Sequence, residues 1–139
     1  MTKIKILYLA TANQIEMMGR AASRYDDLEV MSFNLARTTL AEVRSLLRDV
    51  GRLDATLVML PVTSEIEEMR ELLDSLDCNH IISVGKDIRL WALNSVPKED
   101  ALEMYKYLSN SGLENYERAL DFILNRYCGW DVDVKDHVE

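Results

Sequence analysis

The chain has 139 residues, of which 48% are hydrophobic and 29% charged, as in one soluble globular domain. Its net charge of −8 repels phosphate backbones, which argues against a nucleic-acid partner. Two widely separated cysteines, the absence of a cleavable leader pattern and apolar runs far shorter than a bilayer span predict a cytoplasmic protein without a membrane span.

Four apolar runs predict β-strands, at residues 4–9, 28–33, 56–60 and 80–84. The last two are almost continuously apolar, as in parallel strands that are covered on both faces. A fifth strand is predicted at 88–93, with Trp91 packing on it.

Amphipathic helices are predicted between the strands, because apolar residues recur there at helical spacing. Each predicted start has a capping side chain three residues before an acid, which satisfies the free N–H groups of the first turn. The pairs are Asn13 with Glu16, Thr39 with Glu42, and Ser64 with Glu67.

After Pro97 the pattern changes to two consecutive helices. The first is predicted at 98–110, with Leu102, Tyr105 and Leu108 facing inward. The second opens with Ser111 as cap, paired with Glu114. Its apolar stripe is Leu113, Tyr116, Leu120, Ile123, Leu124 and Tyr127, and Asn115 is placed on the polar side of its first turn. The pair is predicted to form a helical hairpin over one face or the edge of the sheet.

Alternation of strands and helices with short loops predicts an α/β fold with three layers. The expected form is a doubly wound, mostly parallel, flavodoxin-like sheet of four or five strands in the order 2-1-3-4. Residues 1–128 are predicted to form this single domain. Residues 129–139 are predicted to be an irregular tail, which is either the truncation point of a longer protein or an ordinary frayed terminus.

Ligands of such sheets bind beyond the carboxyl ends of the strands, so the loops at that edge supply the candidate binding residues. Residues 10–13 lack the glycines of a dinucleotide site, and Leu60–Pro61 replaces the aspartate of a phosphorylatable receiver domain. A capping role for Asn13 and an ordinary turn at 85–87 are the alternatives. The candidates are Thr11, Asn13, Thr63, Ser64, Gly85, Lys86 and Asp87.

Metal binding and covalent catalysis find little support in the sequence. Cys78 and His80 lie two residues apart but are too few for a closed metal site, and His137 lies in the tail. Residues 77–80 have the wrong spacing for a cobalamin-binding loop. A serine or cysteine nucleophile with a positioned base is not recognisable, so neither catalytic residues nor a metal site is predicted.

The segment 107–127 resembles the very large subunit of cobalt and magnesium chelatases, in which a tyrosine precedes two glycines and an asparagine that opens an apolar helix. Tyr107, Gly112 and Asn115 fall in that register, whereas Ser111 stands at the first glycine. Residues 6–12 and 84–87 are similar to the family's first strand and loop and to the turn after its fourth strand. The chain departs at Pro61–Val62, where many members have a glycine pair.

The resemblance implies that the chain is the non-catalytic N-terminal domain of a tetrapyrrole-binding subunit. The whole enzyme would insert cobalt into a corrin precursor or magnesium into protoporphyrin, using ATP through partner ATPase subunits. The domain itself is expected to bind no cofactor, and Tyr107, Gly112 and Asn115 are expected to be structural. The alternative is a stand-alone flavodoxin-like module that binds a small ligand or a protein.

Overall fold

The computed structural model describes residues 3–61 and 63–139. The strands are β1 (Ile4–Ala10), β2 (Leu28–Asn34), β3 (Ala55–Leu60) and β4 (Ile81–Gly85). The helices are α1 (Ala12–Ala22), α2 (Leu40–Leu46), α3 (Ile66–Ser75), α4 (Ile88–Trp91), α5 (Lys98–Asn110) and α6 (Leu113–Cys128). In these ranges no helix is long and apolar enough to cross a membrane.

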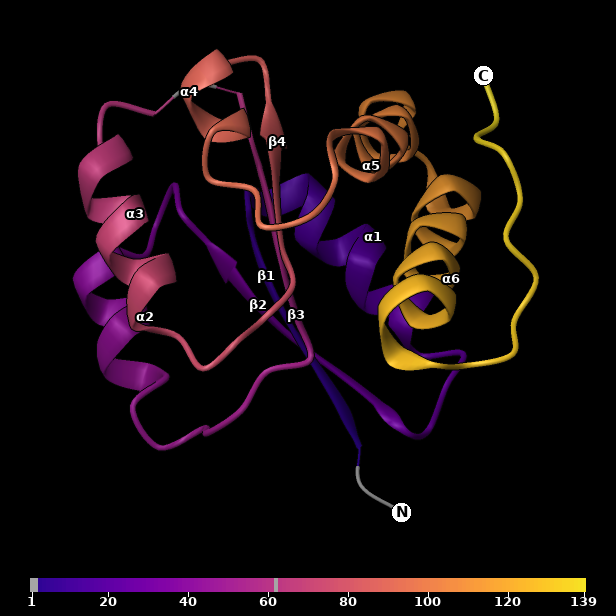
Figure 1. Ribbon diagram of the computed structural model, residues 1–139, viewed down its shortest axis with the longest axis horizontal. Coiled ribbons are helices and arrows are strands. Elements are labelled where there is room, and N and C mark those ends of the chain that lie inside the picture. The colour runs from indigo at the N-terminus through magenta and orange to yellow at the C-terminus, as the bar shows by residue number, and fades with distance from the viewer. Residues whose placement is uncertain (1–2, 62) are drawn as a thin grey trace.

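The four strands form one parallel sheet in the order β2-β1-β3-β4, which confirms the predicted topology. Helices α1, α5 and α6 cover one side of the sheet, which we call the α6 face, and α2 and α3 cover the other, which we call the α3 face (Figure 1). The predicted three layers and the C-terminal helical hairpin are therefore confirmed.

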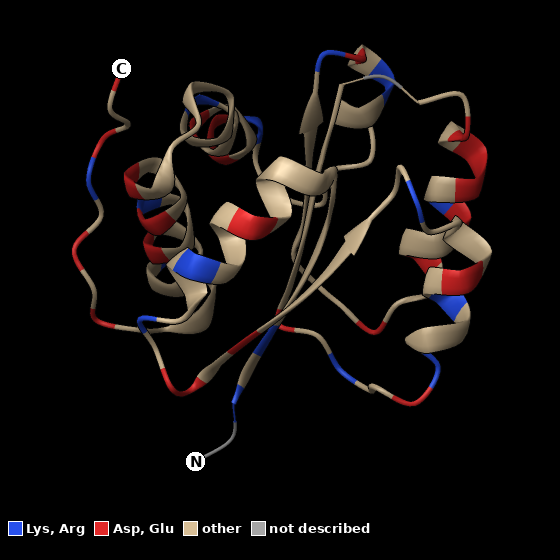
Figure 2. Ribbon diagram, turned by 180° about the vertical axis from the view of Figure 1, so that it is seen from behind, with Lys and Arg blue, Asp and Glu red and all other residues tan. Residues whose placement is uncertain are grey.

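Alternating side chains of the strands supply both cores. In β1, Ile6 and Tyr8 join the cluster under the α6 face, whereas Leu7 and Leu9 join the cluster under the α3 face. All residues of β3 are buried, as the continuous apolar run predicted. Acidic and basic residues lie mainly on the helices and connecting segments, while the middle of the sheet is almost free of charge (Figure 2).

The fifth strand predicted at 88–93 is wrong, because these residues form the short helix α4 and the turn after it. Two side chains then occupy the outer edge of β4 where a fifth strand would pair. Asn94 accepts from Ser83 N at 2.6 Å and donates to Ser83 O at 2.7 Å. Ser95 Oγ accepts from Ile81 N, and the main-chain N–H of Ser95 donates to Ile81 O. A short irregular segment thus satisfies an edge that would otherwise invite strand pairing.

The predicted helix starts are correct in one of four cases. Thr39 and Glu42 form the predicted reciprocal cap of α2, with Glu42 N donating to Thr39 Oγ1 at 3.1 Å. Helix α1 instead begins after Thr11, and α3 begins after Glu65, whose N–H donates to Thr63 Oγ1 at 3.0 Å. Helix α6 begins after Gly112 with no side-chain cap. In each of these three cases another nearby residue takes the capping position.

Helix α5 has the predicted bounds, and of its three residues predicted to face inward Leu108 is buried and Tyr105 is partly buried, but Leu102 is wrong. Leu102 is 47% exposed, whereas Ala101, Met104 and Leu108 are buried against α6 and the sheet. The side chain that the pattern suggested at the start of the stripe therefore points to solvent. The predicted stripe of α6 is confirmed at its buried members Tyr116, Leu120, Ile123 and Leu124.

Candidate functional site

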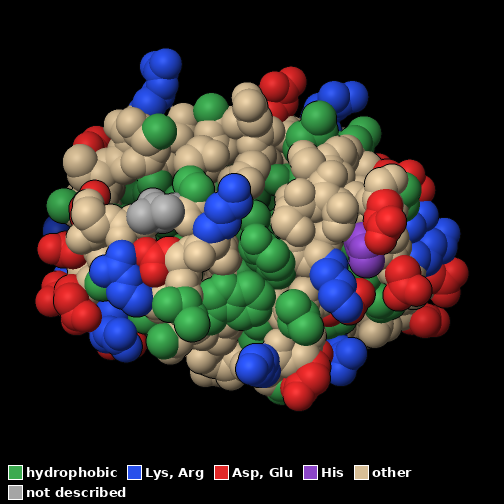
Figure 3. Space-filling view, turned by 90° about the horizontal axis from the view of Figure 1, so that it is seen from above, with side chains coloured by type: hydrophobic (Ala, Val, Ile, Leu, Met, Phe, Trp, Pro, Cys, Tyr) green, Lys and Arg blue, Asp and Glu red, His purple; other side chains and the backbone are tan. Residues whose placement is uncertain are grey.

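The carboxyl ends of the parallel strands meet at the upper end of the molecule in Figure 1, where the predicted binding loops also lie. Seen from above, hydrophobic side chains gather in the middle of this surface, with most acidic side chains toward its margins (Figure 3). The candidates divide into two groups, one around the ends of β1 and β3 and one after β4.

The first group lines a pocket of about 280 Å³. Thr11 follows β1, Thr38 precedes α2, and Thr63 and Ser64 follow β3, so four residues with hydroxyl groups contribute to the lining. Leu40, Leu60 and Met69 are among the apolar residues of the lining. This position between β1 and β3 is the switch point of the strand order, where open α/β sheets bind ligands.

Thr11 also fixes the entry to α1. Its main-chain N–H approaches Gln14 Oε1 at 3.5 Å, and Gln14 and Ile15 donate back to Thr11 O. Asn13, the predicted cap, is the second residue of α1. Its side chain is exposed and does not line the pocket. The structure thus brings Thr11, Thr63 and Ser64 together and separates Asn13 from them.

Gly85 is required by close packing of the backbone. Its φ is +156°, and a Cβ at this position would lie 1.9 Å from Leu60 O. No side chain fits between β3 and the exit of β4, which explains the glycine in the turn.

Asp87 is already engaged by Arg89. The carboxylate accepts from Arg89 N and Nε at 3.0 Å and from Arg89 Nη2 at 2.6 Å, which lowers the pKa of Asp87 to about 2. Arg89 Nη2 also donates to Thr63 O at 2.9 Å, which ties the turn after β4 to the pocket wall. Lys86 is exposed beside this turn. Gly85 and Asp87 therefore shape the turn after β4, which lies beside the pocket.

Tyr107, Gly112 and Asn115, the residues that resemble the chelatase motif, lie on the α6 face and do not line this pocket. Gly112 precedes α6 with φ +85°, and Tyr107 is buried in α5. Asn115, predicted on the polar side of α6, is 3% exposed and hydrogen-bonded to Ser111 O and to both main-chain groups of Val138. Asn115 can be buried because Val138 in the tail forms hydrogen bonds with its side-chain amide. The local sequence pattern around α6 does not indicate these bonds.

Cys78 and His80 are packed within the amino end of the sheet. Thr56 Oγ1 donates to Cys78 Sγ at 3.4 Å, and the His80 ring stacks on Tyr127 with centroids 4.7 Å apart. Burial raises the pKa of the Cys78 thiol. In the part of the chain that the structure describes, no three His, Cys, Asp or Glu side chains are grouped closely enough to hold a metal ion.

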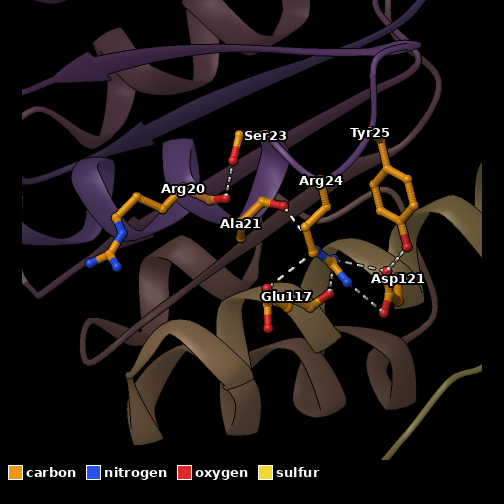
Figure 4. Close-up of polar contacts among 7 residues, drawn as sticks. All are labelled: Arg20, Ala21, Ser23, Arg24, Tyr25, Glu117 and Asp121. Carbon is orange, nitrogen blue, oxygen red and sulfur yellow. Dashed lines mark hydrogen bonds and ion pairs between the residues drawn. The ribbon is translucent and has the colours of Figure 1, made fainter.

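A polar cluster that the sequence did not suggest joins the end of α1 to α6 (Figure 4). Arg24 Nη2 donates to Asp121 Oδ1 at 3.0 Å and to Glu117 O at 2.9 Å, and Tyr25 donates to the same Asp121 oxygen at 2.7 Å. Arg24 Nε also donates to Ala21 O. The cluster holds two segments together and leaves no free base or nucleophile, so we assign it a structural role.

Neither a family model nor a curated protein sequence matches this chain. Among solved structures, the fold is similar to part of the catalytic subunit of cobaltochelatase from Mycobacterium tuberculosis, with a TM-score of 0.68 and 15% sequence identity. The match covers 97% of this chain and 11% of that chain, so the chain spans about a tenth of the subunit's length. At this identity the likeness shows the fold.

Proposed function

We propose that this chain is a non-catalytic domain of the large, tetrapyrrole-binding subunit of an ATP-dependent metal chelatase. The observation that carries the proposal is the structural likeness along 97% of the chain to a portion of a cobaltochelatase catalytic subunit. The chelatase-like residues Tyr107, Gly112 and Asn115, chosen from the sequence alone, support it independently.

The contacts of these residues support a scaffold role. Tyr107 and Asn115 hold the main chain of the tail, and Gly112 supplies the positive φ before α6. A group that is saturated by such contacts is not available to move protons or to bind a metal. We therefore assign binding of cobalt or magnesium, and the insertion step, to other domains of the enzyme, with ATP used by its partner subunits.

Metal insertion by the chain alone is the first test. The chain is mixed with protoporphyrin and either Co²⁺ or Mg²⁺, and the visible absorption spectrum is followed, because insertion of a metal changes the bands of the ring. We expect the same rate as without protein. Acceleration by the chain alone would contradict the non-catalytic assignment.

Membership in a chelatase is tested separately. The chain is used as bait for the ATPase subunits and for the remaining part of the large subunit of the same organism, and a reading frame that continues far past Glu139 is expected. A protein that neither continues into nor associates with such a part would contradict the proposal, whatever the outcome of the insertion assay.

The pocket beside β1 and β3 favours a second candidate, a small-ligand module. Its lining combines four residues that carry hydroxyl groups with apolar residues, and among the described lining residues Glu65 alone is charged. Such a lining suits a small neutral ligand with hydrogen-bonding groups better than a phosphate. NMR titration with small amides and alcohols should shift the amides of Thr11 and Thr63, and inorganic phosphate should not. Shifts with phosphate alone would contradict this candidate.

A further inference from the structure

The tail is fastened to the α6 face by side chains that contact its main chain. We call residues 130–138 the strap. Tyr107 donates to Lys135 O, and Arg118 Nη1 donates to Asp136 O at 2.6 Å. Asn115 Nδ2 donates to Val138 O and its Oδ1 accepts from Val138 N, both at 2.7 Å. At the near end, Asn125 Nδ2 donates to Trp130 O and Val132 O.

The strap runs antiparallel to α6 in an extended form (Figure 1). Asn125 contacts Val132 and Asn115 contacts Val138. The six-residue step from Val132 to Val138 in the strap therefore runs alongside the ten-residue step from Asn125 back to Asn115 in α6. Six extended residues reach about 20 Å, and ten helical residues span about 15 Å. The lengths agree for a slightly curved chain, which lets several anchors on α5 and α6 engage at once.

The anchors are prepared for this role by their own surroundings. Asn115 directs its second N–H to Ser111 O at 2.8 Å, so its amide is fully satisfied although it is buried. Glu114 holds Arg118 by an ion pair of 2.7 Å. Burial raises the pKa of Tyr107 to about 12, so its hydroxyl remains a donor at neutral pH.

At its start the strap packs the Trp130 and Val132 side chains against the core, and beyond Val132 it contributes main-chain groups and keeps most of its side chains in solvent. Lys135, Asp136 and Val138 are exposed, although their carbonyl groups are bound. A surface that bonds peptide groups in this way recognises an extended conformation more than a particular sequence. The same logic is used where a peptide adds to the edge of a sheet.

We propose that the anchors Tyr107, Asn115, Arg118 and Asn125 form a binding site for an extended polypeptide, which the strap fills within the same chain. The site fixes the direction of the chain after α6, because the strap returns to the end of the molecule where the strands have their carboxyl ends. This inference does not depend on the proposed chelatase function.

Paired substitutions in the strap test main-chain recognition. Val138→Pro removes the N–H that donates to Asn115 Oδ1, whereas Val138→Ala keeps it, and residue 138 lies outside the core. With Val138→Pro we expect ¹⁵N relaxation to show increased motion of residues 134–139, while Val138→Ala stays like the wild type. Equal behaviour of the two variants would overturn the proposal.

Paired substitutions on the helices test the anchor. Asn115→Ala should increase hydrogen exchange of the Val138 amide at least about tenfold, whereas Asn110→Ala, whose side chain bonds Lys106 O within α5, should not. The Trp130 amide, which donates to Leu124 O, is expected to stay protected in both. Unchanged exchange at Val138 in Asn115→Ala would count against the site. Circular dichroism checks that each variant is folded. If Asn115→Ala is unfolded, the comparison of Val138→Pro with Val138→Ala tests the proposal in its place.

Binding from solution is tested on the full-length Val138→Pro variant, whose own strap is weakened. A synthetic peptide of residues 130–139 should shift the side-chain amide signals of Asn115 and the guanidinium signals of Arg118. The same peptide with proline at position 138 should bind at least about tenfold more weakly, which corresponds to 1.4 kcal/mol. No shift, or equal shifts with both peptides, would contradict an exchangeable peptide site.

Discussion

The two faces of the sheet are built differently. On the α6 face, three helices bury the larger core cluster, and polar contacts join α1, α6 and the strap. On the α3 face, α2 and α3 leave surface cavities of about 500 and 260 Å³ along their contact, whereas the cavity of about 400 Å³ on the other side lies at its margin, between α4 and the start of α5. Since both faces receive alternate side chains of the same strands, the helices make the difference.

This difference separates the two kinds of candidate residue. The chelatase-like residues Tyr107 and Asn115 belong to the closely packed α6 face, where they hold the chain together. The hydroxyl-lined pocket borders α2 and α3 at the carboxyl end of the sheet. The residues that hold the chain together and the open surface with space for a ligand therefore lie on different sides of the domain.

The largest expected effect compares one buried leucine from each face. Leu120→Ala leaves an enclosed cavity under α6 and should lower the free energy of unfolding by about 4 kcal/mol. Leu72→Ala widens a groove that Leu72 already lines, so we expect about 2 kcal/mol. Urea denaturation of both variants measures this. Equal losses would show that the two faces are packed alike.

The next contrast is between an interhelical acid and a surface acid. Asp121→Ala leaves Arg24 and Tyr25 without their shared acceptor and should cost about 2 kcal/mol. Glu67→Ala removes an exposed partner of Arg70 on α3 and should cost less than about 0.5 kcal/mol. Thermal unfolding of the two variants is the measurement. A loss at Glu67 as large as that at Asp121 would remove the distinction.

Two tyrosines of α6 test whether the closely packed face is fully satisfied. The buried hydroxyl of Tyr116 lies near that of Tyr8 but forms no well-aligned hydrogen bond with any described residue, so Tyr116→Phe should raise stability by about 1 kcal/mol. Tyr127 donates to Asp100, so Tyr127→Phe should lower it by about the same amount. Chemical denaturation decides. Destabilisation by Tyr116→Phe would reveal a bond that its hydroxyl makes in solution.

The last contrast needs no substitution and appears only at alkaline pH. Burial raises the pKa of Tyr8, Tyr107, Tyr116 and Tyr127 above the usual value near 10, and all four lie under the α6 face. The unfolded chain therefore loses these protons first, so the contribution of these four tyrosines to stability is constant below about pH 10 and is lost as pH rises toward about 12. Melting temperature and absorbance at 295 nm against pH measure this. Constant stability up to pH 12 would contradict it.

Much of the fold followed from local patterns. The strand order and the bounds of the helix at 98–110 were predicted because hydrophobic period and short connections restrict the topology. The error at 88–93 has a physical reason, since a short apolar run suits a strand and a helix equally. The contacts of Asn94 and Ser95 with β4 decided between them.

The candidate pocket was predicted in part for the same reason. Thr11, Thr63 and Ser64 could be placed together because the carboxyl ends of parallel strands meet at one edge. Asn13 was misplaced because the position of a helix start is set by the three-dimensional turn before it. Asp87 could not be recognised as engaged, since nothing in the sequence states that Arg89 folds back onto it.

The sequence by itself determined the parallel α/β sheet and the hairpin of α5 and α6, because these depend on periodicity and on neighbours in the chain. The tertiary structure alone decided which polar groups meet. Arg24 and Asp121 are 97 residues apart, and Asn115 and Val138 are 23 apart. These pairs form only when the helices pack at a particular angle, because that angle decides which residues far apart in the sequence come within hydrogen-bond distance.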